Sequence, residues 1–174
     1  MKRVLGKNRV VFQEKTKMGD EGKFQKEITT VKMKKKLESS GHILADKKIC
    51  KDNIYEIRAI ISEWIVASQL DVVLTTGGTG VTGRDGTPEA VSPLFDKTLD
   101  GFGEMFRALS YDEIATSTLQ SRAIAGVANA TYVFTLPGSP GACRLAWDSL
   151  IEHQLNSTTK PCNLVELMPR LLEK

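Results

Sequence analysis

The chain has 174 residues, 41% of them hydrophobic, which is enough apolar material for one compact core. No run approaches the roughly 18 consecutive apolar residues that cross a membrane, and no N-terminal stretch resembles a signal peptide. The three cysteines suit neither a disulfide framework nor a paired-cysteine metal site. These features predict a cytoplasmic protein with no membrane partner.

Positive charge is concentrated at the N-terminus. Residues 1–36 hold 12 Lys/Arg and 4 Asp/Glu, whereas residues 37–174 hold 12 and 17. A basic arm on an acidic body could bind nucleic acid, but no known nucleic-acid motif accompanies it, so nucleic acid is the less favoured partner. We interpret residues 1–32 as a basic, poorly ordered segment ahead of an α/β domain over residues 33–174.

The first regular elements follow Leu37. Residues 42–50 alternate partly and end apolar, which favours a strand. Asn53 is a suitable N-cap for a helix whose apolar stripe runs over residues 54–65. Leu70–Thr76 is a continuous apolar run, typical of a strand that is buried on both faces.

A glycine-rich loop, TTGGTGVTGRDGTPEA, contains the end of this run, and Thr87 and Pro88 predict a helix start behind it. Farther along, residues 117–128 are predicted to be helical and Thr131–Leu136 to be a second apolar strand. Ser139 is then the predicted N-cap of an amphipathic helix that extends toward Leu155.

Alternating strands and helices predict a Rossmann-like α/β fold with a mostly parallel sheet and helices on both faces. Ligands of such sheets bind beyond the carboxyl ends of the strands. Residues 77–85 and 137–139 both follow strand ends, so we expect the two loops at the same edge of the sheet.

The residue types in these loops suit an anion and a metal ion. Backbone N–H groups of Gly77, Gly78 and Gly80 can converge on a phosphate. Asp52 and Asp85 could hold Mg²⁺, which prefers one or two carboxylates together with substrate phosphates. The competing interpretation is that Asp52 caps its helix and Asp85 makes a loop turn or an ion pair. Spacing alone leaves both interpretations open.

Several segments occur in the order found in one family. These are GHILADKKICKDN, TTGGTGVTGRDGTPEAV, GFGEMFRALSYDEIATSTLQSRAIAGVAN, LPGSPGACRLAWDSLI and KPCNLVELMP. From about Leu37 to Pro169 the chain resembles the MoaB/MogA family of molybdenum cofactor biosynthesis proteins, and the MoaB branch more closely. The resemblance implies a homotrimer or homohexamer that works with other molybdenum cofactor biosynthesis proteins.

The resemblance also implies a reaction, the transfer of AMP from Mg-ATP to the terminal phosphate of molybdopterin. Asp52 and Asp85 match the catalytic carboxylates that organise Mg²⁺ and the triphosphate. The substrate-binding positions that the resemblance implies are Gly77, Gly78, Thr79, Gly80, Ser121, Gly138 and Ser139. The alternative is a non-catalytic molybdopterin-binding or assembly protein of the same fold.

The first 32 residues depart from the family, whose members open with an apolar central strand and a Ser-Asp loop. Val10–Phe12 and Ile28–Val31 are short strand candidates crowded by lysines, and neither resembles a buried central strand. The first strand is therefore unassigned, and a sheet without it is expected to be less stable. We hypothesise a shifted reading frame upstream of Met33. Resequencing tests this hypothesis, and the lack of a family-like strand in every frame would refute it.

Overall fold

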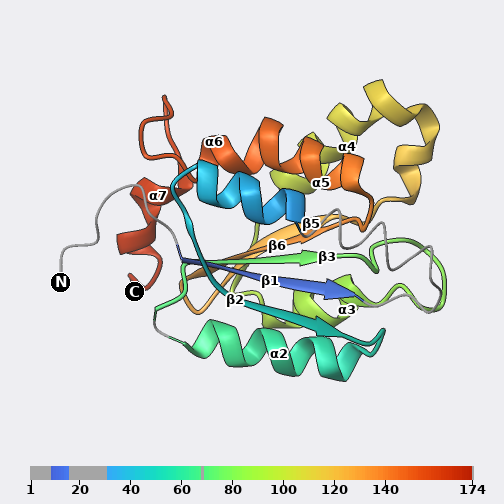
Figure 1. Ribbon diagram of the computed structural model, residues 1–174, viewed down its shortest axis with the longest axis horizontal. Coiled ribbons are helices and arrows are strands. Elements are labelled where there is room, and N and C mark those ends of the chain that lie inside the picture. The colour runs from blue at the N-terminus through green and yellow to red at the C-terminus, as the bar shows by residue number, and fades with distance from the viewer. Residues whose placement is uncertain (1–8, 16–30, 68, 174) are drawn as a thin grey trace.

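The computed structural model describes residues 9–15, 31–67 and 69–173, which form a six-stranded sheet with helices on both faces (Figure 1). The strand order is β2-β1-β3-β6-β5-β4. β1 is parallel to β2 and β3, and β3 is parallel to β6, whereas β5 and β4 run antiparallel to their neighbours. The predicted α/β fold with a mostly parallel sheet is confirmed.

The strands are β1 (Arg9–Lys15), β2 (Ile43–Cys50), β3 (Val72–Thr76), β4 (Lys97–Thr98), β5 (Ile124–Ala128) and β6 (Thr131–Leu136). The α-helices are α2 (Ile54–Val66), α3 (Thr87–Val91), α4 (Asp100–Ile114), α5 (Pro140–Ala146), α6 (Glu152–Gln154) and α7 (Leu164–Leu167). Other helical segments are η1 (Ser92–Leu94), η2 (Ala115–Gln120), η3 (Trp147–Ile151) and η4 (Met168–Arg170), and residues 31–39 are also helical. Within the described ranges no helix has the length and apolar character needed to cross a membrane.

Two hydrophobic cores lie on opposite faces of the sheet. Residues 31–39, α4 and the run from α5 to α6 cover one face, and α2 and α3 cover the other (Figure 1). Successive residues of a strand point to opposite faces, so Leu74 packs into the first core and Val73 into the second. β3 and β6 are buried over their whole length, which explains their continuous apolar sequences.

A strand from the basic N-terminal segment lies inside the sheet, which corrects the sequence interpretation. In β1, Phe12 is paired with Lys47 of β2 and with Leu74 of β3. The position between two strands requires backbone N–H and C=O partners on both sides, and an extended segment of any composition supplies them. Of the other candidate, Val31 belongs to the helical segment 31–39 and residues 28–30 lie outside the described residues.

The helix predicted over residues 117–128 was wrong. That stretch contains the end of η2 and the whole of β5, which pairs antiparallel with β6. The chain reverses at Asn129 and Ala130, whose φ angles are 46° and 62°. Positive φ at both residues of a two-residue turn matches the twist of a hairpin, but glycine usually marks such turns. Alanine at the second position hid the hairpin from a sequence-based prediction.

Two of the three predicted helix caps were correct. The Asn53 side chain accepts hydrogen bonds from the N–H groups of Tyr55 and Glu56, and Ser139 Oγ accepts from the N–H of Ala142. Thr87 is instead the first residue of α3, and Gly86 precedes it without a side-chain cap. The hydroxyl of Thr87 instead donates a hydrogen bond to Gly77 O in the glycine-rich loop.

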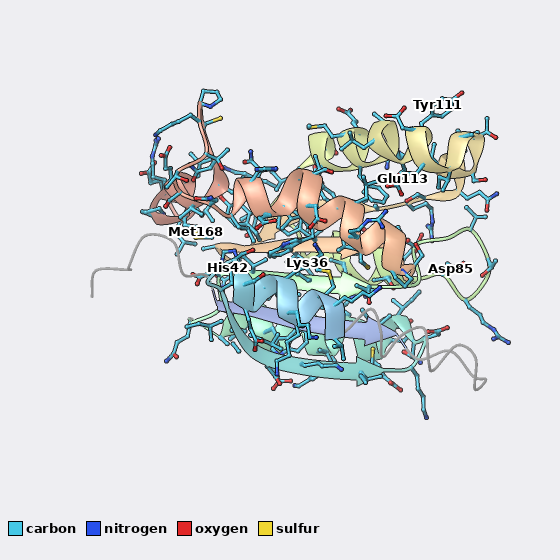
Figure 2. The ribbon with its side chains drawn as sticks, turned by 45° about the horizontal axis from the view of Figure 1, so that its top comes forward. Lys36, His42, Asp85, Tyr111, Glu113 and Met168 are labelled. Carbon is cyan, nitrogen blue, oxygen red and sulfur yellow. The ribbon has the colours of Figure 1, made fainter. Side chains whose placement is uncertain are left out.

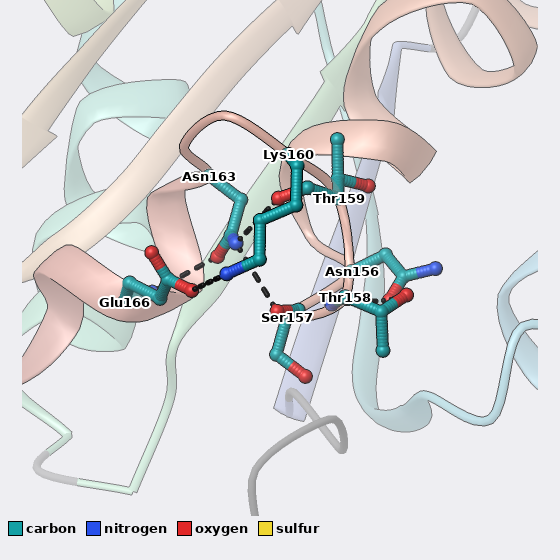
Figure 3. Close-up of polar contacts among 7 residues, drawn as sticks. All are labelled: Asn156, Ser157, Thr158, Thr159, Lys160, Asn163 and Glu166. Atoms are coloured by element: carbon teal, nitrogen blue, oxygen red, sulfur yellow. Dashed lines mark hydrogen bonds and ion pairs between the residues drawn. The ribbon is translucent and has the colours of Figure 1, made fainter.

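A single buried asparagine organises the C-terminal loop (Figure 3). Asn163 is 1% exposed, and its Nδ2 donates to the carbonyl oxygens of Ser157 and Thr159. Its Oδ1 accepts from the N–H of Glu166 and thereby caps α7. This explains the asparagine in the segment KPCNLVELMP, which closes the first core through Val165 and Met168.

Candidate functional site

The loops that follow β2, β3 and β6 meet at one edge of the sheet. The last register pairs there join Thr76 to Leu136 and to Glu14, and Cys50 to Lys15. Figure 2 shows Asp85 at the end toward which the arrows of the parallel strands point. Because ligands of open α/β sheets bind beyond this edge, the three loops form the candidate site.

The glycine loop, residues 77–86, begins with two residues in the left-handed region. Gly77 has a φ of 91° and Gly78 a φ of 70°, which other residue types rarely adopt. The N–H of Gly77 donates to Leu136 O at 2.9 Å, and Thr87 closes the loop by donating its N–H to Gly78 O and its Oγ1 to Gly77 O. The Gly77 N–H is therefore committed to β6. Gly77 shapes the loop, and an anion cradle would depend on the N–H groups that follow.

The second loop packs directly against the first. A Cβ atom added to Gly138 would lie 3.2 Å from Gly77 Cα, which is tighter than an ordinary van der Waals contact. The expected meeting of residues 77–85 and 137–139 is thus observed. A side chain at position 138 would require the two backbones to move apart slightly.

Gly138→Ala is expected to lower the free energy of unfolding by about 1 kcal/mol, because the added methyl group forces two backbones apart. Gly141→Ala is the matched control, since its Cβ would have no neighbour within 4 Å. Urea denaturation of both variants measures the difference. Equal stability of the two variants would contradict the close contact.

The carboxylate of Asp85 folds back onto its own loop. Its Oδ2 accepts from the N–H of Thr82 at 3.0 Å and from Thr82 Oγ1 at 2.6 Å. A Cβ on Gly80 would lie 2.8 Å from the same oxygen. Asp85 therefore makes the loop turn that the competing interpretation proposed. A turn of this kind also holds the side chain in a fixed direction, and the two roles are compatible.

Asp52 lies in the exposed connection between β2 and α2. Asn53 caps α2, so Asp52 is not needed as the cap. The two carboxylate-bearing loops are neighbours, because a Cβ on Gly86 would lie 2.8 Å from Ile54 Cγ1. Among the described residues no group of three or more His, Cys, Asp or Glu side chains could hold a metal ion.

Three hydroxyl-bearing residues line the same region. Thr79 is 3% exposed, and its carbonyl oxygen accepts from the N–H of Arg122 at 2.9 Å. Next to Arg122, the buried Ser121 Oγ has no hydrogen-bond partner within the described part of the chain. Buried hydroxyl groups are almost always paired, so this atom calls for an explanation. Ser139 is exposed and caps α5 with its Oγ.

Arg122 is a residue of this region that the sequence analysis missed. Its Nε donates to Gly80 O at 2.8 Å, its Nη2 donates to Asp85 O at 2.5 Å, and its Nη1 pairs with the Glu89 carboxylate. The hydrogen bond from Arg122 to the Glu89 carboxylate holds the pKa of Glu89 below its ordinary value. Arg122 directly follows Ser121 in sequence, but nothing in the sequence indicated that it reaches the glycine loop.

Comparisons with known proteins give a consistent answer. A family model described as "Probable molybdopterin binding domain" matches residues 19–157, so the match begins upstream of Leu37. Molybdenum cofactor biosynthesis protein B of Escherichia coli (strain K12) is 56% identical over 126 residues, which are 72% of this chain and 74% of the relative.

Solved structures agree with the fold. A crystal structure of Molybdenum cofactor biosynthesis protein B has a TM-score of 0.83 at 35% identity, covering 97% of this chain and 99% of that one. The tungsten cofactor synthesizing protein MoaB from Pyrococcus furiosus has a TM-score of 0.75 at 32% identity, covering 86% and 94%.

Proposed function

The chain belongs to the MoaB/MogA family of molybdenum cofactor biosynthesis proteins, and we propose that it transfers AMP from Mg-ATP to the terminal phosphate of molybdopterin. Family membership supports the role in cofactor biosynthesis with molybdopterin as substrate. The transfer reaction, ATP and Mg²⁺ are parts of the proposal. We further propose that the ligand-binding residues lie within residues 33–174 of a domain whose sheet also includes β1.

The observation that carries the proposal is the buried Ser121 Oγ, which has no hydrogen-bond partner among the residues that the structure describes. Leaving a buried hydroxyl unpaired costs about 1–3 kcal/mol, and a phosphate oxygen could accept its hydrogen. Thr79 and Arg122 connect this residue to the loop that holds Asp85. Ser121 and the loop that carries Asp85 are therefore neighbours, as a site for a phosphorylated ligand requires.

Mg²⁺ suits the two carboxylates that this region offers. Asp52 and Asp85 lie on neighbouring loops, and a pair of carboxylates completed by phosphate oxygens is a common set of magnesium ligands. When bound, the ion would neutralise negative charge on the triphosphate.

The residues of the chain would act by binding and alignment. A terminal oxygen of molybdopterin phosphate forms a bond to the α-phosphorus of ATP, and the bond from that phosphorus to the bridging oxygen breaks to release pyrophosphate. Because two anions must approach, catalysis depends on positioning and charge neutralisation more than on a protein nucleophile. Ser121 and the loop N–H groups would hold one phosphate, and Asp85 and Asp52 would organise the other.

Incubation with Mg-ATP and molybdopterin, followed by detection of adenylylated molybdopterin, tests the proposal. Formation of the product is the expected result. Binding of molybdopterin without turnover would contradict the transfer reaction and favour a non-catalytic binding or assembly protein. A protein that binds neither substrate would overturn both.

We also propose that the protein is a homotrimer or a homohexamer. α4 and η2 expose large apolar side chains, and these are Met105, Tyr111, Ile114 and Leu119. Figure 2 shows Tyr111 at the outer surface of α4. Light scattering on the purified protein measures the assembly, and a monomer at micromolar concentration would contradict this part of the proposal.

A further inference from the structure

We propose that Arg122 is a positioning residue that holds the glycine loop, and with it Asp85, in one fixed shape. The effect on adenylyl transfer rests on the function proposed above, whereas the effect on the loop does not. Arg122 lies between η2 and β5, outside the loop, but it contacts both ends of it. Its backbone N–H bonds Thr79 O, and its guanidinium bonds Gly80 O and Asp85 O.

Between these two ends the loop is also restrained by a turn of its own. Asp85 Oδ2 bonds Thr82, and the Asp85 N–H donates to Thr82 O at 2.9 Å, so the turn is closed internally. An internally closed turn can still rotate as a unit. Arg122 prevents such a rotation because its Nε and Nη2 bond carbonyl oxygens on either side of the turn. The direction of the Asp85 carboxylate then follows from the position of Arg122.

Arg122 itself is anchored from the side away from the loop. Glu89 pairs with Nη1, and α3 is in turn fixed to α2 by Arg58, whose Nε donates to Ala90 O and whose Nη2 donates to Glu89 O. α2 begins just after Asp52, so the same set of contacts relates the loops of both proposed catalytic carboxylates. Arg122 is the point at which this set reaches the glycine loop.

The same contacts argue against Arg122 as a phosphate ligand. All three guanidinium nitrogens bond protein acceptors, and the Glu89 carboxylate offsets the positive charge. The Arg122 side chain is 33% exposed, so part of this electrostatic attraction is screened by solvent. A planar guanidinium can bond separate acceptors at once, whereas a lysine ammonium is a point charge. Arg122→Lys is therefore expected to fail as a replacement.

Hydrogen exchange of the ligand-free protein tests the loop directly. In Arg122→Gln we expect the amides of residues 79–86 to exchange at least about tenfold faster, while amides of β3 and β6 exchange as before. Arg144→Gln is the matched control, because Arg144 of α5 forms an exposed ion pair with Glu113 of α4. Unchanged loop exchange in Arg122→Gln would overturn the inference. So would equally faster exchange of β3 and β6, because that result shows a global loss of stability.

Adenylyl-transfer kinetics add a second readout. Arg122→Gln and Arg122→Lys are expected to lose about 100-fold in kcat, with a smaller change in the KM for ATP, because the loop is misplaced. In Arg122→Ala, added guanidinium at non-denaturing concentration should restore part of the rate. A change confined to the KM for ATP, with unchanged loop exchange, would show that Arg122 binds phosphate and would refute the positioning role. If the unmodified protein shows no transfer, the proposed function fails while the exchange experiment still decides the role of Arg122.

Discussion

Asp85→Asn is expected to reduce kcat for adenylyl transfer by about 100-fold or more, because the proposed magnesium and phosphate site loses a negative ligand. The asparagine Oδ1 can still accept a hydrogen bond from Thr82, so the loop turn should survive. Molybdopterin affinity should therefore change little. Single-turnover kinetics and a separate binding titration measure the two quantities.

The control for this variant is Asp148→Asn, which removes a carboxylate of η3 that pairs with Lys36, on the face of the sheet that α4 and α5 cover. A partly exposed pair contributes about 0–1 kcal/mol, so this variant should keep its activity. Asp52→Asn should resemble Asp85→Asn, and the double variant should be about as slow as either single one, because groups that act as a unit are not additive. Full activity in Asp85→Asn would contradict the assignment.

Phe12→Pro is expected to lower the free energy of unfolding by about 3 kcal/mol, because proline removes a backbone N–H from a strand that has neighbours on both sides. β1 pairs with β2 and with β3, so the lost hydrogen bond lies in the sheet interior. Chemical denaturation followed by circular dichroism measures the change.

Phe12→Leu is the comparison for Phe12→Pro, since it keeps the backbone N–H and an apolar side chain. The proline variant should also lose transfer activity, because β1 borders β3 and Glu14 pairs with Thr76, next to the glycine loop. If the two variants prove equally stable, β1 does not occupy the position between β2 and β3. Equal stability of the two variants would also support the expectation from the sequence that the sheet lacks a stable first strand.

Elements with strong local signals were predictable from the sequence. The apolar runs of β3 and β6 and the caps Asn53 and Ser139 depend on residues close together in the chain, and the structure has all four. The same holds for the placement of the glycine loop between β3 and α3. These features follow from periodicity, turn chemistry and the capping of backbone groups, which act over a few residues.

Elements whose partners lie far away in sequence were predicted less well. Residues 124–128 are rich in alanine and looked helical, but pairing with β6 makes them a strand. A Cβ on Gly126 would lie 2.4 Å from the Phe95 ring, so the strand also depends on a contact with a residue far from it in the chain. Propensity is a weak guide where tertiary pairing decides the outcome.

The sequence by itself determined the buried strands β3 and β6, the two loops at the carboxyl edge, and the family to which the chain belongs. Only the tertiary structure decided that residues 9–15 of the basic N-terminal segment form a central strand, that β5 runs antiparallel, and that Arg122 bonds the glycine loop. The reason is physical. Periodicity and helix caps depend on residues that are close together in the chain. The position of a strand in the sheet and the contacts of a guanidinium depend instead on which backbone N–H and C=O groups need partners in the completed fold.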